Sequence, residues 1–317
     1  MLTTALATLR SLLFSISPDE ASFSRRGFDC PSAAARARLQ RVGETFIAGY
    51  NAAIAVNDIH ALEERLERIH CEWRGFAYEG AAMALALRDV LTPWHRDRFE
   101  AFLRGPGDRH AYMAHIGAGW ALARLKRSFE NAMARHDPLL RWLLLDGFGF
   151  HEGYFHTDRT MDGSTAPATL QGYARRAFDQ GLGRCIWFVA GAEVVRTRTL
   201  VDRFKSDRHR DLWAGIGLAV AYAGGVGEGA IRNLTTAAGE FQPEFALGVA
   251  FAAKARDRAG NPVDHTEQAC QTVWQRSAEA AAGITDEMLV DLPPDNEVPS
   301  FEVWRQRIQD RWKKNQE

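Results

Sequence analysis

The stretch Asp-Gly-Phe-Gly-Phe-His-Glu-Gly-Tyr-Phe-His at residues 146–156 contains the side chains whose types and spacing could do chemistry. Glu152 and His156 are four residues apart, so they share one face of a helix, and His151 directly precedes the glutamate. A carboxylate and an imidazole in this relation can act as a general acid and base, or as two metal ligands. The alternative is a structural ion pair in a packed helix. We predict Glu152, His156 and His151 as catalytic residues.

A glycine pattern with a period of about 34 residues organises the chain around this stretch. Gly-x-Gly pairs begin 30, 34 and 34 residues apart, with a less regular copy on either side; the six copies start at Gly80, Gly117, Gly147, Gly181, Gly215 and Gly248. Arg-rich segments with apolar residues at helical spacing separate them. The pattern predicts an all-α fold, an array of about six α-helical hairpin repeats forming a tetratricopeptide-like solenoid.

Small residues recur on one face of each glycine-marked helix. The residue two places after the first glycine is Gly or Ala in all six copies. A helix-interior glycine costs about 0.5 to 1 kcal/mol relative to alanine, so its recurrence indicates that neighbouring helices approach closely there.

Three segments make up the predicted chain. Residues 1–58 form an N-terminal capping segment, residues 59–285 form the repeats, and residues 286–317 form a Pro-containing linker and a C-terminal helix. That helix places Trp304, Ile308 and Trp312 on one stripe, which we expect to dock on the body.

The third copy breaks the apolar pattern at the chemical stretch. Five residues after the first glycine, the third copy has Glu152, whereas the other copies have Leu85, Leu122, Ile186, Val220 and Ala253. An ionised carboxylate buried at such a position costs several kcal/mol unless it is paired or takes up a proton. This contrast supports a functional role for Glu152, and a structural ion pair with His156 remains the alternative.

Further polar and aromatic residues on the repeats are candidates for binding a substrate: Arg184, His115, Glu79, Trp120, Phe150 and Trp187. Arg184 replaces apolar residues of other copies, and we expect it to pair with Glu152 or Glu193 or to bind an anionic group. If a transition metal binds, Glu152, His156 and His115 are its predicted ligands. The sequence indicates no other cofactor.

Composition excludes several classes of function. The 39 basic and 40 acidic residues leave a net charge of −1, so the chain has no net positive charge that would attract nucleic acid. The chain has no P-loop, dinucleotide-binding, HExxH or GxSxG motif.

The expected location is the cytoplasm. The four cysteines form no CxxC pair, and we expect them to be reduced thiols. Residues 1–16 lack the apolar core of a signal peptide. The most apolar window, residues 212–227, is too short for a membrane span, which needs about 20 residues.

Several long segments carry a resemblance to a known family: RGFAYEGAAMALALRDVLTPW, HAYMAHIGAGWALARL, DPLLRWLLLDGFGFHEGYFH, FDQGLGRCIWFVAGAEV, DLWAGIGLAVAYAGG and VAFAAKARDRAGN. Together they resemble the bacterial UnbL family, which is encoded in the gene cassettes for enediyne antibiotic cores. The resemblance implies a role beside an iterative polyketide synthase that makes a long conjugated polyene. It also implies companions of the UnbV and UnbU types, the latter a membrane protein, and it brings no established catalytic residues.

Two functions fit these features. The first is a biosynthetic accessory protein, an enzyme or enzyme subunit, that binds the polyene intermediate and assists its oxidation or rearrangement. The alternative is a non-catalytic helical scaffold for the polyene, its carrier, the synthase or the companion proteins. In either case the chain could form a homo-oligomer and lie at a membrane through its membrane partner.

Overall fold

The fold is built from helices alone in the part of the chain that the structure describes. The structure is a computed structural model, and it describes residues 2–92, 94, 97–125, 129–163, 167 and 170–316. Eighteen α-helices and three short 3-10 helices cover these residues, and no strand occurs among them. The predicted all-α repeat array is therefore confirmed.

Seven long helices form the body: α3 (Ala33–Ala55), α5 (Cys71–Leu91), α7 (Ala111–Leu125), α9 (Trp142–Phe155), α11 (Tyr173–Val189), α13 (Ser206–Ala223) and α15 (Gln242–Ala259). Each packs on the next one along the chain. They run parallel, because contacts join matching ends. Arg38 near the start of α3 pairs with Glu72 near the start of α5, whereas Arg88 near the end of α5 donates to Ala53 O at the end of α3.

Short helices return the chain between the long ones, because two parallel helices cannot be joined by a tight turn. They are α4 (Ile59–Glu67), α6 (Arg98–Leu103), α8 (Phe129–Met133), α10 (Thr157–Thr160), α12 (Val194–Val201), α14 (Glu228–Ala237) and α16 (Asp264–Trp274). The 3-10 helices are η1 (Pro18–Ala21), η2 (Asp108–His110) and η3 (Gly239–Phe241). One long helix and its return helix make up each repeat.

The glycines lie where neighbouring long helices touch. A Cβ added at Gly117 would collide with the carbonyl oxygen of Glu79 in the preceding helix. A Cβ added at Gly119 would collide with the carbonyl oxygen of Leu144 in the following helix. The first glycine of a pair therefore contacts the preceding helix and the second contacts the following helix. The predicted close approach of neighbouring helices at the glycines is present.

Helix α3 takes part in the same packing. A Cβ at Gly49 of α3 would collide with the carbonyl oxygen of Ala77, and one at Gly80 would collide with that of Phe46. The capping segment predicted at residues 1–58 thus contributes one further long helix with a glycine contact to the array. The remainder of that segment comprises α1 (Leu2–Phe14), η1 and α2 (Phe23–Arg26).

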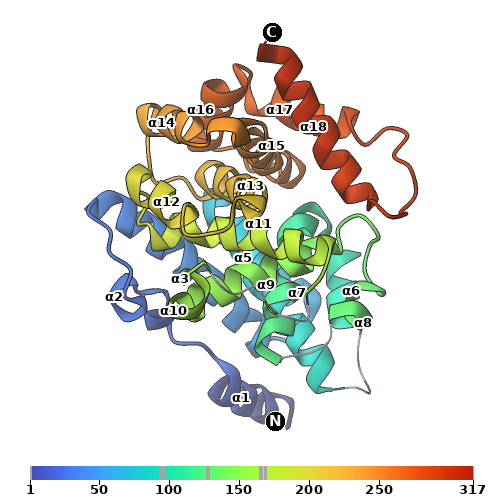
Figure 1. The fold of residues 1–317 in the computed structure, drawn as a ribbon. Coiled ribbons are helices and arrows are strands. Elements are labelled where there is room, and N and C mark those ends of the chain that lie inside the picture. The colour runs from blue at the N-terminus through green and yellow to red at the C-terminus, as the bar shows by residue number, and fades with distance from the viewer. Residues whose placement is uncertain are drawn as a thin grey trace.

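The array curls until its ends meet. Arg38 of α3 donates to the carbonyl oxygen of Ala223 at the end of α13 over 2.6 Å. Arg256 of α15 and Asn261, just beyond that helix, donate to the carbonyl oxygens of Glu72 and Cys71 over 2.7 and 3.1 Å. The long helices consequently enclose a common axis, while α1 and the C-terminal helices lie at opposite ends of the molecule (Figure 1).

The C-terminal part is α17 (Ala278–Glu287) followed by α18 (Ser300–Gln316). Trp304, Ile308 and Trp312 are all buried, so the predicted stripe does dock on the body. Arg305 on the same helix is fully buried and pairs with Asp211 of α13 at 2.7 Å. None of the helices described here is long and apolar enough to cross a membrane.

Candidate functional site

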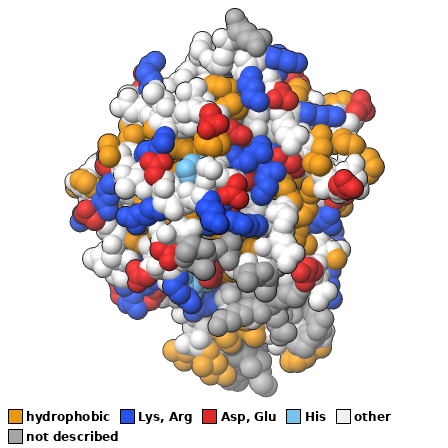
Figure 2. Space-filling model, in the orientation of Figure 1, with side chains coloured by type: hydrophobic (Ala, Val, Ile, Leu, Met, Phe, Trp, Pro, Cys, Tyr) orange, Lys and Arg blue, Asp and Glu red, His pale blue; other side chains and the backbone are white. Residues whose placement is uncertain are grey.

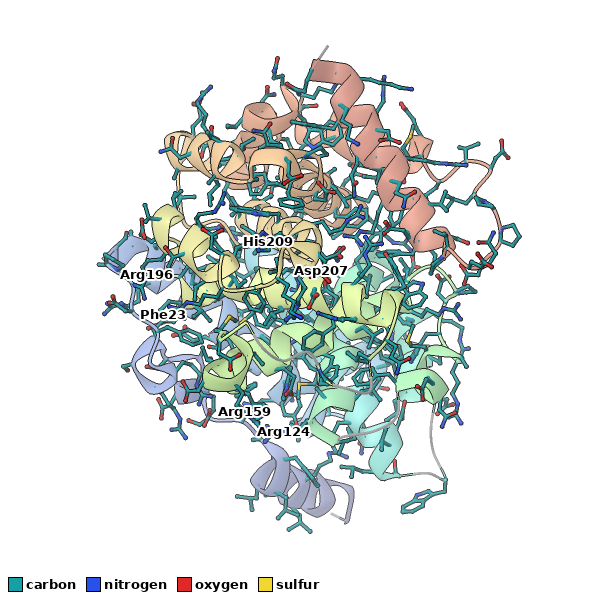
Figure 3. All side chains as sticks on the ribbon, viewed as in Figure 1. Phe23, Arg124, Arg159, Arg196, Asp207 and His209 are labelled. Carbon is teal, nitrogen blue, oxygen red and sulfur yellow. The ribbon has the colours of Figure 1, made fainter. Side chains whose placement is uncertain are left out.

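A narrow apolar cavity lies inside the curl of long helices. It holds about 840 Å³ of space not filled by protein atoms, part of which is open to solvent. Helices α3, α5, α7, α9, α11 and α13 all contribute to its wall. Arg124, an exposed residue of this wall, lies toward the end of the molecule that carries α1 (Figure 3).

Aromatic rings form much of the wall. Trp120 of α7 lies between Phe46 of α3 and Phe150 of α9, with ring centroids 4.6 and 5.3 Å away. On another side Phe76 of α5 meets Tyr222 of α13 edge to face at 5.1 Å. Flat, polarizable surfaces on several sides suit a thin ligand with conjugated double bonds.

A buried ion pair joins Arg184, a residue of the cavity wall, to Asp146. Arg184 of α11 donates through Nε to Asp146 Oδ1 of α9 at 2.7 Å, and Gln180 Nε2 donates to the other carboxylate oxygen at 2.8 Å. The Arg184 guanidinium also lies 4.9 Å from the ring centroid of Phe150. Arg184 therefore pairs with Asp146. The expected pairing with Glu152 or Glu193 is wrong, since Glu193 caps α12 and Glu152 bonds to His151.

Glu79 of α5 brings a second carboxyl group into the cavity wall. It is only 4% exposed, and burial raises its pKa to about 8, against the opposing charge of Arg184 and with a smaller contribution from Asp146. The Trp120 indole, like Arg184, favours the ionised form and so lowers the pKa of Glu79, but both effects are smaller than that of burial. Glu79 is therefore mostly protonated at neutral pH and presents an O–H donor.

The three predicted catalytic residues do lie together, at the C-terminal end of α9. Glu152 Oε1 lies 3.0 Å from His151 Nδ1 and 4.0 Å from His156 Nε2. Burial lowers the pKa of His151 despite the nearby carboxylate. Burial opposes ionisation of Glu152, but His151, His156 and Arg159 outweigh it and lower that pKa. Glu152 is thus a carboxylate that accepts a hydrogen bond from a neutral His151.

The group formed by His151, Glu152 and His156 lies beside the cavity. Neither His151 nor Glu152 belongs to the wall, although His151 contacts Trp120 edge to face at 5.7 Å. Glu152 is also less buried than its apolar counterparts Leu85, Ile186 and Val220, because its long side chain reaches the surface.

Two other predicted residues lie elsewhere. His115 bonds through Nδ1 to Ala111 O at 2.8 Å and contacts His136 and Phe99 on the side of α7 away from Glu152 and His156. Trp187 is fully buried and donates to Gly224 O at 2.9 Å. Of the predicted substrate-binding residues, Glu79, Trp120, Phe150 and Arg184 line the cavity.

The predicted metal ligands do not form a site. His115 is separated from Glu152 and His156 by its place in a different cluster of rings. No group of three or more His, Cys, Asp and Glu side chains that could hold a metal occurs in the described part of the chain.

Sequence reasoning missed Asp146, Gln180 and Tyr222. A signal was present for two of them, because the residue before the first glycine is Glu79, Asp146 or Gln180 in three copies. In the other three copies this residue is apolar: Ile116, Ala214 and Leu247. The carbonyl of this residue faces the glycine of the next helix, so its side chain belongs to the closely packed interior.

The helical array with its axial cavity defines a class of all-α repeat proteins with an internal cavity. The chain belongs to the family described as "Protein of unknown function (DUF1702)", whose model matches residues 5–312. Neither the curated proteins nor the solved structures contain a match to it.

Proposed function

We propose that the protein binds a long, thin, apolar molecule of the conjugated polyene class in its central cavity and assists the conversion of that molecule during enediyne core formation. The cavity carries the first part of the proposal, because aromatic rings from six helices line it and Glu79, whose carboxyl group is mostly protonated at neutral pH, belongs to its wall. The resemblance to the UnbL family supports the pathway.

Two groups could contribute to chemistry on the bound chain. Glu79 can donate a hydrogen bond or a proton to an oxygen atom of the ligand, since a neutral buried acid is a suitable general acid. Glu152 with His151 and His156 is a second acid/base group at the end of α9. Its place beside the cavity requires the ligand, or a water molecule, to reach it past Trp120 or Phe155.

Binding is tested by titration with a linear conjugated polyene alcohol whose fluorescence increases in apolar surroundings. We expect saturable binding that Ala219→Phe weakens at least about tenfold, or about 1.4 kcal/mol, because Ala219 lines the cavity. Ala34→Phe is the matched control, since Ala34 is exposed on α3. Val42→Phe provides a second cavity-filling variant if Ala219→Phe unfolds. Unchanged binding in folded cavity variants would contradict the proposal.

The second candidate is a scaffold that holds companion proteins, and the surface of α1 favours it. Leu12 and Leu13 are 79% and 67% exposed, and hydrophobic side chains gather at the end of the molecule where α1 lies (Figure 2). A scaffold role predicts that Leu12→Ser with Leu13→Ser disrupts complex formation while polyene binding persists. A cavity role predicts loss of product in Ala219→Phe while complexes persist.

A further inference from the structure

The hydroxyl group of Tyr222 is buried without a hydrogen-bond partner among the described residues. Its ring contacts Phe76, with ring centroids 5.1 Å apart, and the Arg256 guanidinium, which lies 4.1 Å from its centroid. A Cβ at Gly75 would collide with the hydroxyl, so this glycine makes room for it. An unpaired buried hydroxyl costs about 1 to 3 kcal/mol, which a ligand acceptor would recover.

Tyr222 also lies at a junction between two cavities. It lines the central cavity together with Leu218, and both residues line a smaller cavity of about 420 Å³ between α7, α13, α15 and α18. A chain that extends from one cavity toward the other would therefore pass Tyr222 and Leu218.

Glu79 lies on α5 one turn after Gly75, the glycine that makes room for the Tyr222 hydroxyl. Its proximity contributes to the raised pKa of Tyr222, after burial and against Arg256. Glu79 and Tyr222, each of which carries an O–H donor, thus both line one apolar cavity. The buried cation in the cavity wall, Arg184, is already neutralised by Asp146.

We infer that the cavity selects an uncharged apolar chain that carries a hydrogen-bond acceptor oxygen, a carbonyl or a hydroxyl group, placed between Glu79 and Tyr222. This inference rests on the proposed function of the cavity as a ligand site. A free carboxylate placed between Glu79 and Tyr222 would add an anion to a buried place where the nearby cation, Arg184, is already paired with Asp146, which is costly. A plain hydrocarbon would leave the Tyr222 hydroxyl unpaired. The natural ligand is therefore an enone, aldehyde, thioester or alcohol rather than a free acid.

Four linear conjugated polyenes of equal length test this selection: the aldehyde, the alcohol, the carboxylic acid and the hydrocarbon. At pH 7 we expect the aldehyde and the alcohol to bind about five- to tenfold more tightly than the acid and the hydrocarbon, as about one hydrogen bond implies. Tyr222→Phe should remove most of the preference over the hydrocarbon. Tyr78→Phe is the control, because Tyr78 is buried outside the cavity and donates to Glu67.

The pH dependence gives an independent readout. The charged or titratable groups that face Glu79 are Arg184 of α11, Asp146 of α9 and Tyr222 of α13, and α7 adds the indole of Trp120. Aldehyde binding should stay constant from pH 6 to 7 and weaken above about pH 8 as Glu79 ionises. Glu79→Gln removes the titrating group, so the affinity of this variant for the aldehyde should be the same at pH 6 and pH 9.

The outcomes separate the two proposals. Equal affinity for all four probes, or tightest binding of the acid, would overturn the inference and leave the binding function intact. Failure of every probe to bind the wild-type protein would overturn both. Binding that Ala219→Phe leaves unchanged would show that the probes bind outside the cavity, which also overturns both.

Discussion

At the scale of residues, two carboxyl groups of similar intrinsic acidity are placed in opposite states. Burial keeps Glu79 protonated, whereas Glu152 stays ionised because His151 donates to it and because His156 and Arg159 lie near. The same residue type can therefore supply a proton donor inside the cavity and a base beside it.

Replacing Glu79 by glutamine should stabilise the protein at neutral pH. The carboxyl group has an ordinary pKa of 4.5 when unfolded and about 8 when folded, so stability falls as pH rises from about 4.5 to 8. At pH 7 the variant should gain about 2 to 3 kcal/mol in the free energy of unfolding. Urea denaturation at pH 5 and pH 7.5 measures it, and the gain should be smaller at pH 5. Glu152→Gln is the control, since its lowered pKa predicts no such gain.

The double substitution Glu152→Leu with His156→Phe separates a structural from a functional role at the end of α9. Buried pairs are often no better than apolar packing, and Glu152 is partly exposed, so thermal unfolding should change little. A working acid/base group predicts loss of product in a complemented pathway at unchanged stability. Full product formation by the variant would remove residues 151–156 from the mechanism.

At the scale of elements, close contact between parallel helices depends on single glycines. Each pair places one glycine against the preceding helix and one against the following helix, so that main chain meets main chain. The return helices lie outside these contacts and tolerate different lengths, from four residues in α10 to eleven in α16.

Gly217→Leu should destabilise the protein strongly. Even a Cβ at this position would collide with the carbonyl oxygen of Phe245, so α13 and α15 must separate at a cost of at least about 1 to 3 kcal/mol. The melting temperature measures this effect. Gly229→Leu in α14 is the matched control, because a Cβ there meets nothing within 4 Å. A melting temperature equal to that of the wild type would contradict the glycine contact.

At the scale of the whole molecule, the curvature of the repeat array makes the long helices enclose a cavity. The glycine contacts let the helices lie close, and the side chains of Arg38, Arg256 and Asn261 donate hydrogen bonds to main-chain carbonyl groups that join the two ends. Helix α18 covers the C-terminal end, where Arg305 links it to Asp211 of α13 and also contacts Glu302 and Tyr173.

Arg305→Met should weaken the packing of α18 on the body. Removing the guanidinium leaves the buried Asp211 with Arg176 as its remaining ion-pair partner, which should cost about 2 to 4 kcal/mol of stability. Chemical denaturation measures the loss, and limited proteolysis should release α18 earlier than in the wild type. Lys313→Met on the same helix is the control, because its ion pair with Asp310 is exposed and should contribute less than about 1 kcal/mol.

The sequence by itself determined the all-α class, the repeat period and the contact role of the glycines, because these features recur locally in every copy. It also predicted that Glu79, Trp120, Phe150 and Arg184 belong to a binding surface, since each departs from a pattern or offers an aromatic face. Only the tertiary structure decided that Arg184 pairs with Asp146, that Tyr222 faces the same cavity and that His115 does not reach Glu152. These relations join helices far apart in the chain. The curvature that brings them together is the sum of many small contact angles, and no local pattern specifies that sum.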